Sequence, residues 1–440
     1  MSEEGPSPIR APPGVPGSSD AACEPIPHDV WAISITSLFS DWGYEMVLPV
    51  LPFFLAFSLA ASPFIVGLVD GAAQFGQSVM STVSGDRWAH RRDRKSRAAI
   101  GYAITGAAHG ILALATTAPQ VLALRVSAWL GRGARQPIKR AILANASRSH
   151  RQGRTFGLEQ AMDSAGAVIG TVLAVAILAS FAYAPGADPT PAFRLIFLVS
   201  IAPSAVAVLL VLLFVRDRNR TAAEAARLAT GAPPAPLPRS FRWFLAAEAL
   251  FGLGYFSILL ALLRVGENLL PSTGGSIAAI TITALLLYLL YNILYTAVAY
   301  PAGRLSDRSP GLWLVAISFL LFALVDLFLV LGGSLLVGVL TFVVAGVQVA
   351  IQGVAESAWV ARYLAPQEVG RAFGRLGTVQ GITILLGSLL VGGLWTYFTP
   401  EIAFATSGVL CVAGALLLGP AAASHRRERT GPAGALLGRL

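Results

Sequence analysis

The chain has 440 residues, of which 55% are hydrophobic and 12% are charged, with a formal net charge of +9 and a mean hydropathy of +0.67. This number of charged side chains is too small to cover the surface of a water-soluble domain. The composition therefore excludes an ordinary soluble protein and favours a membrane protein. The positive charge lies mainly in connecting segments, which explains the net charge without a nucleic-acid partner.

The predicted elements begin after residues 1–27, which are rich in Pro, Gly and Ser and are expected to form a disordered cytoplasmic tail. Stretches of about 20 apolar residues, long enough to cross the hydrocarbon core, then recur along the chain. They predict an all-α integral membrane protein with twelve transmembrane helices in two pseudo-symmetric six-helix bundles. The expected crossings lie at 30–57, 62–84, 98–117, 119–146, 155–182, 193–215, 243–264, 275–302, 311–331, 334–362, 371–396 and 401–421.

These crossings divide the chain into an N-terminal bundle, residues 28–215, and a C-terminal bundle, residues 241–421. Between them, residues 216–240 contain Ala-Pro repeats and alternating basic residues, a composition typical of a cytoplasmic linker. Residues 422–440 form a short basic tail.

Lys and Arg are distributed unevenly among the connections. The loop 85–97 contains six basic residues, whereas the next connection, around 117–119, contains no charge. Because cytoplasmic loops retain the positive residues, we expect both termini to lie in the cytoplasm of a bacterial cell and the chain to span the inner membrane several times.

One five-residue sequence motif occurs twice, about half a chain length apart. Gly153-Arg-Thr-Phe-Gly157 and Gly370-Arg-Ala-Phe-Gly374 stand at the start of the fifth and eleventh crossings, and each is followed thirteen residues later by another glycine, Gly170 and Gly387. In a membrane protein, duplicated halves usually enclose a site at their interface that opens alternately to each side.

A basic loop beginning Gly85-Asp86-Arg87, and Gly303-Arg-Leu-Ser-Asp-Arg308 after the eighth crossing, resemble the major facilitator superfamily over roughly residues 30–420. Asp41-Trp-Gly-Tyr-Glu45 in the first crossing resembles a poorly characterised bacterial subgroup. The resemblance implies a secondary transporter that works by alternating access. It also implies charged residues that latch the cytoplasmic ends of the halves, here Asp86, Arg87, Arg91, Arg154, Asp307, Arg308 and Arg371.

Two acids occur in the first crossing. Asp41 and Glu45 are four residues apart, so both project from one helix face, and a rise of about 1.5 Å per residue places them roughly 16–22 Å deep. A carboxylate near the middle of the bilayer is costly unless it is protonated, paired or in contact with water, which indicates proton or cation binding. The corresponding second-half stretch, 251–256, is uncharged, and this favours a functional role over the alternative of an acid that only pairs helices.

Further polar residues lie in later crossings. Arg132 and Arg135 on the fourth crossing are expected at a depth similar to Glu159 and Asp163 on the fifth, which is explained about equally by an Arg–carboxylate network and by binding of an anionic substrate. Arg125, closer to the outside on the fourth crossing, is a further candidate. Gln348 and Gln352 form a polar stripe on the tenth crossing that is expected to line the central cavity. The candidate proton-coupling or substrate-binding residues are therefore Asp41, Glu45, Arg125, Arg132, Asp163, Gln348 and Gln352.

The sequence contains no phosphate-binding loop, no metal-ligand spacing and no nucleophile motif, so we expect neither an enzyme nor a bound cofactor or metal. The leading hypothesis is a proton-coupled secondary transporter that exports small amphiphilic or cationic organic compounds. Its expected partners are a small-molecule substrate, protons and the lipid bilayer, and its expected functional unit is a monomer. Two alternatives stay open, proton-coupled uptake of a small organic anion and a non-transporting membrane receptor on the same scaffold.

Overall fold

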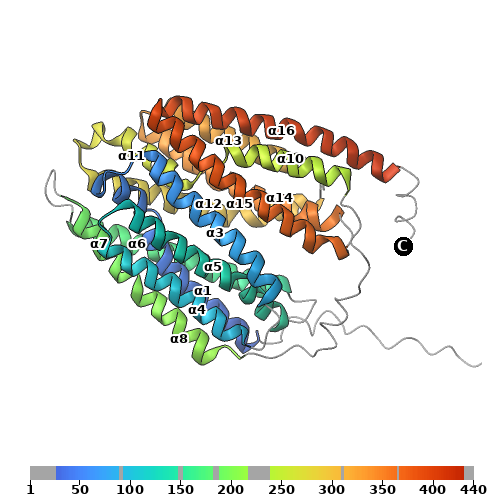
Figure 1. Cartoon of the computed structure of the whole chain (residues 1–440), viewed down its shortest axis with the longest axis horizontal. Coiled ribbons are helices and arrows are strands. Elements are labelled where there is room, and N and C mark those ends of the chain that lie inside the picture. The colour runs from blue at the N-terminus through green and yellow to red at the C-terminus, as the bar shows by residue number, and fades with distance from the viewer. Residues whose placement is uncertain are drawn as a thin grey trace, which may run out of the picture.

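The computed structural model describes residues 26–88, 93–146, 152–181, 188–216, 238–308, 312–363 and 366–430. Every regular element within these ranges is a helix, and none is a strand. In Figure 1 the helices run side by side along the length of the molecule, with most helices of the N-terminal half (blue to green) below those of the C-terminal half (yellow to red).

The N-terminal half is built mainly of long helices. They are α1 (His28–Val47), α3 (Pro63–Arg87), α4 (Arg94–Ile111), α5 (Ala118–Ala146) and α6 (Gln152–Phe181), followed by the shorter α7 (Thr190–Val199) and α8 (Ile201–Phe214). The short α2 (Leu51–Phe53) and the π-helix η2 (Phe54–Ser58) connect α1 to α3, and the 3-10 helix η3 (Leu112–Leu114) follows α4. Helix α1 ends just before Pro49, which has no N–H to continue the hydrogen-bond ladder.

The C-terminal half begins with a broken helix. Its elements are α10 (Arg239–Gly254), α11 (Ile258–Leu269), the 3-10 helix η5 (Pro271–Thr273), α12 (Ile277–Arg308), α13 (Trp313–Leu331), α14 (Leu335–Tyr363), α15 (Pro366–Tyr397) and α16 (Pro400–Thr430). The break follows Gly254, where Tyr255 is extended, and the Ser257 hydroxyl caps α11 by accepting a hydrogen bond from the Leu259 amide at 3.1 Å. Helix α16 continues past the expected end of the last crossing, so part of the expected basic tail is helical.

The repeated glycines lie at close helix contacts within each half. A Cβ at Gly170 on α6 would lie 2.4 Å from the Trp42 carbonyl oxygen of α1, and a Cβ at Gly387 on α15 would lie 2.5 Å from the Tyr255 carbonyl oxygen. Only a residue without a side chain fits at these distances, so each glycine lets one helix lie directly against the first helix segment of its own half.

Helices α3 and α15 make an extended contact between the two halves. The Ser78 hydroxyl donates to the Gly377 carbonyl at 2.7 Å, and the Phe64 amide donates to the Thr396 hydroxyl at 2.9 Å. Helices α6 and α12 make a second contact, where the hydroxyls of Ser164 and Thr296 lie 3.1 Å apart.

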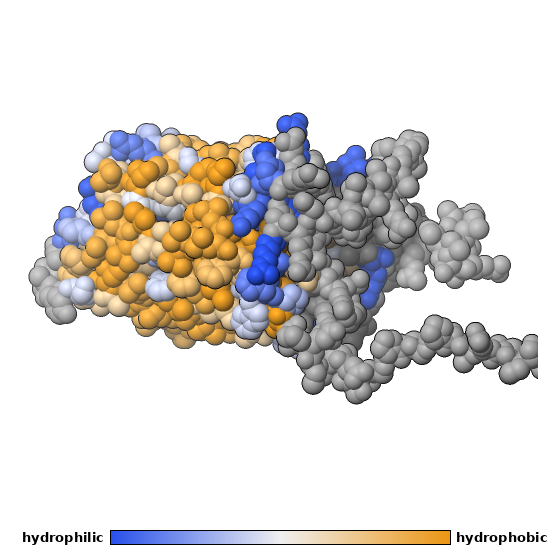
Figure 2. Space-filling model, turned by 90° about the horizontal axis from the view of Figure 1, so that it is seen from below, coloured by the Kyte–Doolittle hydropathy of each residue, from blue (hydrophilic) through white to orange (hydrophobic). Residues whose placement is uncertain are grey.

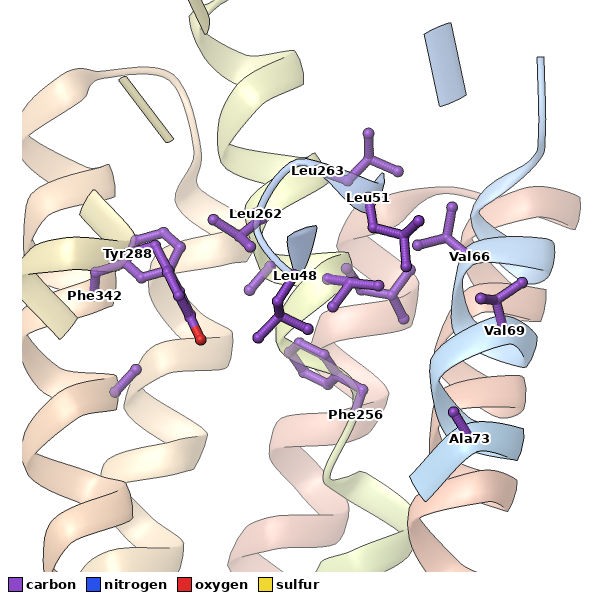
Figure 3. Close-up of a cluster of buried hydrophobic side chains, with 14 of the residues drawn as sticks. Leu48, Leu51, Val66, Val69, Ala73, Phe256, Leu262, Leu263, Tyr288 and Phe342 are labelled. Carbon is purple, nitrogen blue, oxygen red and sulfur yellow. The ribbon is translucent and has the colours of Figure 1, made fainter. Parts of the chain in front are cut away.

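An apolar cluster joins the halves at the end of the molecule that holds α2, here called the α2 end. In Figure 3, Leu48, Leu51 and Val66 of the N-terminal half lie near Leu262 and Leu263 of α11. All five side chains are buried. Side chains from both halves therefore close the α2 end.

The outer surface matches a membrane environment. Figure 2 shows a broad hydrophobic surface on the visible face, with hydrophilic residues at its two ends. Among the described residues, eight stretches are long and apolar enough to cross a membrane: Gly157–Phe181, Thr190–Phe214, Arg239–Leu269, Ile277–Ser306, Trp313–Leu331, Leu335–Val360, Arg371–Tyr397 and Pro400–Ser424.

The other expected crossings coincide with α1, α3, α4 and α5, which are more polar. Helix α5 alone carries Arg125, Arg132, Arg135, Lys139 and Arg140. Twelve crossings in two six-helix bundles therefore stay a prediction, as do the domain boundaries. Most of the expected N-terminal tail and linker lies outside the described residues.

Candidate functional site

A line of three basic side chains follows α5. Arg125, Arg132 and Lys139 are spaced seven residues apart, about two helical turns, so they lie on one face of the helix. Arg125 and Lys139 are buried and Arg132 is half-buried. Each of the three meets a different carboxyl group.

Lys139 connects three helices at one end of this line. Its ammonium group forms an ion pair with Glu159 of α6, and its Nζ lies 3.7 Å from Asp163 Oδ1. It also donates to the Ser37 hydroxyl of α1 at 3.1 Å, and that hydroxyl donates to Glu159 at 3.1 Å. The expected network between α5 and the acids of α6 is present, but Lys139 makes the contacts that sequence analysis gave to arginine.

Arg132 occupies the middle of the line, next to Asp41. Its Nη1 lies 3.9 Å from Asp41 Oδ1, and its guanidinium carbon lies 4.3 Å from the centre of the Tyr44 ring. The carboxyl groups of Asp41 and Asp163 lie within hydrogen-bonding reach of each other. The structure thus brings Asp41, Arg132 and Asp163 together between α1, α5 and α6.

Glu45 lies one turn beyond Asp41, toward the α2 end, and faces the other half of the molecule. One of its oxygens, Oε2, is buried and accepts no hydrogen bond, while the Tyr288 hydroxyl of α12 lies within hydrogen-bonding reach of the carboxyl group. Tyr288 stacks on Tyr291 with ring centres 5.6 Å apart. Acids of the N-terminal half therefore meet aromatic side chains of the C-terminal half.

Acidic groups outnumber basic groups at this site. Among the described residues, the ion pairs of the group Asp41, Glu45, Glu159 and Asp163 involve two basic side chains, Arg132 and Lys139, while the guanidinium of Arg135 lies over the Tyr102 ring at 4.1 Å. In a medium of low dielectric constant, an excess of carboxyl groups is stabilised by bound protons or by a bound cation. The arrangement can therefore take up positive charge.

Arg125 belongs to a separate ion pair. Its Nη2 lies 2.7 Å from Asp70 Oδ1 of α3, and its guanidinium carbon lies 3.4 Å from the centre of the Trp129 ring. Asp70 Oδ2 also accepts hydrogen bonds from the Gln74 amide at 2.8 Å and from the Ser257 hydroxyl at 2.6 Å. Since Ser257 lies in the C-terminal half, this pair connects the two halves, and Asp70 rather than a substrate contacts the Arg125 guanidinium.

Gln348 and Gln352 lie within the C-terminal half. The Gln348 amide donates to Gln352 Oε1 at 2.5 Å, and Gln348 lines a cavity of about 20 Å³ together with Tyr255 and Tyr291. A cavity of that size has room for roughly one water molecule, not for an organic substrate. The stripe continues to Glu356, which contacts both Gln352 and Gln380.

Sequence analysis missed two features of this interior, Lys139 as the central partner of α6 and Asp70 as the partner of Arg125. The seven-residue spacing of Arg125, Arg132 and Lys139 was a visible signal for a single basic face. The partner of each cation was not visible in the sequence, because it depends on how α3 and α6 lie against α5.

The expected cytoplasmic latch stays a prediction. Arg87 is exposed at the end of α3 and Arg371 is half-buried on α15. Arg91 and the side chains of Asp86, Arg154, Asp307 and Arg308 lie outside the part that the structure describes. Among the described residues, no group of three or more His, Cys, Asp or Glu side chains is arranged to hold a metal ion.

Comparisons with known proteins agree with the membrane architecture. The family model of the Major Facilitator Superfamily matches residues 33–287 and 269–437. An uncharacterised MFS-type transporter of Methanocaldococcus jannaschii is 27% identical over 390 residues, covering 89% of this chain and 94% of that protein.

Two solved structures show the same fold. The nucleoside transporter NupG superposes with a TM-score of 0.67 at 14% identity over 89% of this chain and 98% of that chain. The xylose transporter XylE of E. coli, in a partially occluded inward open conformation, gives a TM-score of 0.66 at 13% identity over the same shares. Proteins of this family are multi-pass membrane transporters of small molecules and not enzymes. The resemblance found in the sequence is confirmed, and the chain belongs to the Major Facilitator Superfamily of secondary transporters.

Proposed function

We propose that this transporter couples proton movement to the export of small amphiphilic or cationic organic compounds. The observation that carries the proposal is the excess of carboxyl groups around Asp41 and Glu45. Each carboxyl that is not matched by Arg132 or Lys139 favours a proton or an organic cation as its partner. A proton and a cationic substrate that compete for these acids are exchanged in opposite directions when the site changes sides.

The aromatic groups around the acids support an amphiphilic substrate. Tyr44 and Trp129 line the N-terminal side, with ring centres 5.2 Å apart, and Tyr288 and Tyr291 approach from α12. Aromatic faces attract organic cations and also bury apolar groups. Arg132 is held between Asp41 and Tyr44, which leaves its charge less available to an anionic substrate.

The closed α2 end supports loading from the opposite end. Leu48 and Leu51 pack against α11 there, which favours an approach of the substrate to Asp41 from the end where the basic connections lie. If these connections lie in the cytoplasm, as the distribution of Lys and Arg predicts, the site loads from the cytoplasm, which is the state an exporter needs before release.

The test is transport in proteoliposomes with an imposed pH gradient, using ethidium as the organic cation probe and benzoate as the organic anion probe. Asp41→Asn and Glu45→Gln are each expected to abolish gradient-driven ethidium movement. Asp188→Asn, which changes an exposed acid outside the site, is the matched control and is expected to transport as the unmodified protein does.

The other outcomes separate the alternatives. Unchanged gradient dependence in Asp41→Asn and Glu45→Gln would contradict their coupling role. Benzoate uptake that is lost only in Arg132→Gln would favour the anion importer. No movement of either probe, together with a co-purifying protein, would favour the receptor.

A further inference from the structure

A second group of buried acids lies within the C-terminal half. Glu248 of α10 and Glu356 of α14 are 1% and 6% exposed, and both approach the side-chain amide of Gln380 on α15. Gln380 Nε2 donates to Glu356 Oε2 at 2.8 Å and lies 3.3 Å from Glu248 Oε2. One amide thus holds two carboxyl groups from two different helices.

The two carboxyl groups lie within hydrogen-bonding reach of each other and have no basic partner among the residues that the structure describes. The carboxyl group of Glu248 interacts with Glu356 and Gln380. The carboxyl group of Glu356 interacts with Glu248, Gln352 and Gln380. Tyr255, at the break after α10, is a further titratable group that interacts electrostatically with Glu356. Within the described parts of α10, α12, α13, α14, α15 and α16, no Lys, Arg or His forms an ion pair with either acid.

Two carboxylates this close cannot both keep a negative charge in a buried site without a cation, because their repulsion adds to the cost of burial. A single proton removes that repulsion and also supplies a hydrogen-bond donor. Such a donor is missing, since Glu248 Oε1 and Glu356 Oε1 are both buried without a hydrogen-bond partner. We propose that Glu248 and Glu356 together bind one proton and form a second proton site, distinct from the acids of α1.

Binding changes only the protonation of the pair. The proton comes from water, forms an O–H bond with one carboxyl group, and changes the charge of the pair from two negative charges to one. Gln348 and Gln352 extend from Glu356 to the cavity with room for one water, so they connect the pair to a polar position beside Tyr291.

Gln380 also connects the pair to the contact between the halves. It lies three residues, about one helical turn, from Gly377, whose carbonyl accepts the Ser78 hydroxyl of α3. When α15 moves against α3, the amide that holds both carboxyl groups moves with it. A role of this pair in transport rests on the proposed proton coupling, whereas its occupancy by a proton does not.

The test is infrared spectroscopy of the purified protein at neutral pH, which detects the carbonyl stretch of a protonated carboxyl group. The double variant Glu248→Gln/Glu356→Gln is expected to lose one carboxyl equivalent of this band. Asp326→Asn, which changes another buried acid of the same half, is the matched control and is expected to leave the contribution of the pair in place. An unchanged band in the double variant would overturn the proposal.

A second measurement uses the unmodified protein and covers the case in which the double variant does not fold. The O–H of a protonated carboxyl group adds across a C=N bond of dicyclohexylcarbodiimide, with the proton going to nitrogen and the carboxyl oxygen to carbon. The resulting O-acylisourea rearranges to a stable N-acylurea that mass spectrometry locates. One adduct per chain, on Glu248 or Glu356, supports the site, and adducts confined to other acids overturn it. Both measurements are independent of transport, so a failed flux assay with an intact proton signal would contradict the proposed function alone.

Discussion

The two halves of the chain share one type of close helix contact, but their buried acids have different partners. Gly170 in α6 and Gly387 in α15 each approach a backbone carbonyl at a distance that no side chain tolerates. Beside Gly170, however, the acids of α1 and α6 meet Arg132 and Lys139. Among the described residues, Glu248 of α10 and Glu356 of α14 instead meet side-chain amides and each other. The close backbone contact occurs in both halves, but the pairing of buried acids with basic side chains occurs in the N-terminal half.

The difference shows how each half can respond to protonation. In the N-terminal half, a proton that binds to an acid also releases a basic side chain, so protonation can rearrange neighbouring helices. In the C-terminal half, a proton only relieves repulsion between two acids, and no cation is set free. Substitutions that remove one charge at a time distinguish these two situations.

The largest effect is expected from Arg125→Met. Asp70 is 2% exposed, and without the guanidinium its negative charge is buried with only the Gln74 and Ser257 hydrogen bonds. Breaking a buried ion pair by removing one partner costs about 3–5 kcal/mol. We expect a loss of that size in the free energy of unfolding in mixed detergent micelles.

The double variant Asp70→Asn/Arg125→Met serves as the control for this prediction, because it removes both charges together. It is expected to recover most of the lost stability. An equal loss in the single and double variants would mean that packing around Trp129, and not the buried charge, explains the effect.

A smaller effect is expected from Gly170→Ala. The added Cβ would lie 2.4 Å from the Trp42 carbonyl oxygen, so α6 has to move away from α1, and overpacking of this kind typically costs about 1–3 kcal/mol. Gly157→Ala on the same helix is the matched control, since nothing lies within 4 Å of its Cβ position. That control is expected to be neutral or stabilising, by up to about 1 kcal/mol, because alanine favours the helix. Equal stabilities of the two variants would contradict the close contact.

Features that depend on residues close together in the sequence were predictable, and features that depend on contacts between distant segments were not. Eight of the expected crossings coincide with stretches that are long and apolar enough to cross a membrane, because apolar runs of about 20 residues determine such helices locally. The spacing of Asp41 and Glu45 also placed both acids on one face of α1, as the structure has them. Asp41, Arg132 and Asp163 were all candidate site residues, and the structure places them close together, although their function is still a proposal.

The features that were missed all depend on contacts between distant segments. Arg125 was expected near the substrate, but α3 brings Asp70 against it from 55 positions away. Glu248 and Glu356 lie on two different helices, α10 and α14, and only the approach of α15 places both beside Gln380. Periodicity within one helix gives the face of a residue, but the partner on that face is determined by tertiary packing.

An effect similar to that of Gly170→Ala is expected from Ser257→Ala, which tests the connection between the halves. The Ser257 hydroxyl donates to Asp70 Oδ2 at 2.6 Å, and a hydrogen bond to a charged group contributes about 1.5–3 kcal/mol. Because the bond exists only while the halves are close at this position, its loss favours separation of α3 from α11. We expect a cysteine introduced at Leu262 to react faster with a water-soluble maleimide in this variant.

Ser180→Ala is the control for that experiment, since the Ser180 hydroxyl donates to the Ile177 carbonyl of its own helix. It should leave the labelling rate unchanged. A labelling rate at Leu262 that does not respond to Ser257→Ala would show that the apolar cluster alone holds the α2 end closed.

The smallest effect is expected from Asp326→Asn. This buried acid of the C-terminal half contrasts with Asp70, a buried acid of the N-terminal half. Asp326 is 1% exposed, as deeply buried as Asp70, but within the described residues it forms no ion pair and accepts a hydrogen bond from the Ser407 hydroxyl at 2.9 Å. An asparagine carbonyl accepts the same bond and leaves no cation unpaired. The free energy of unfolding is therefore expected to change by less than about 1 kcal/mol, whereas Asp70→Asn, which leaves Arg125 unpaired, is expected to cost about 3–5 kcal/mol. Equal losses in the two variants would mean that Asp326 carries a charge with a partner of its own, and the contrast between the halves would then fail.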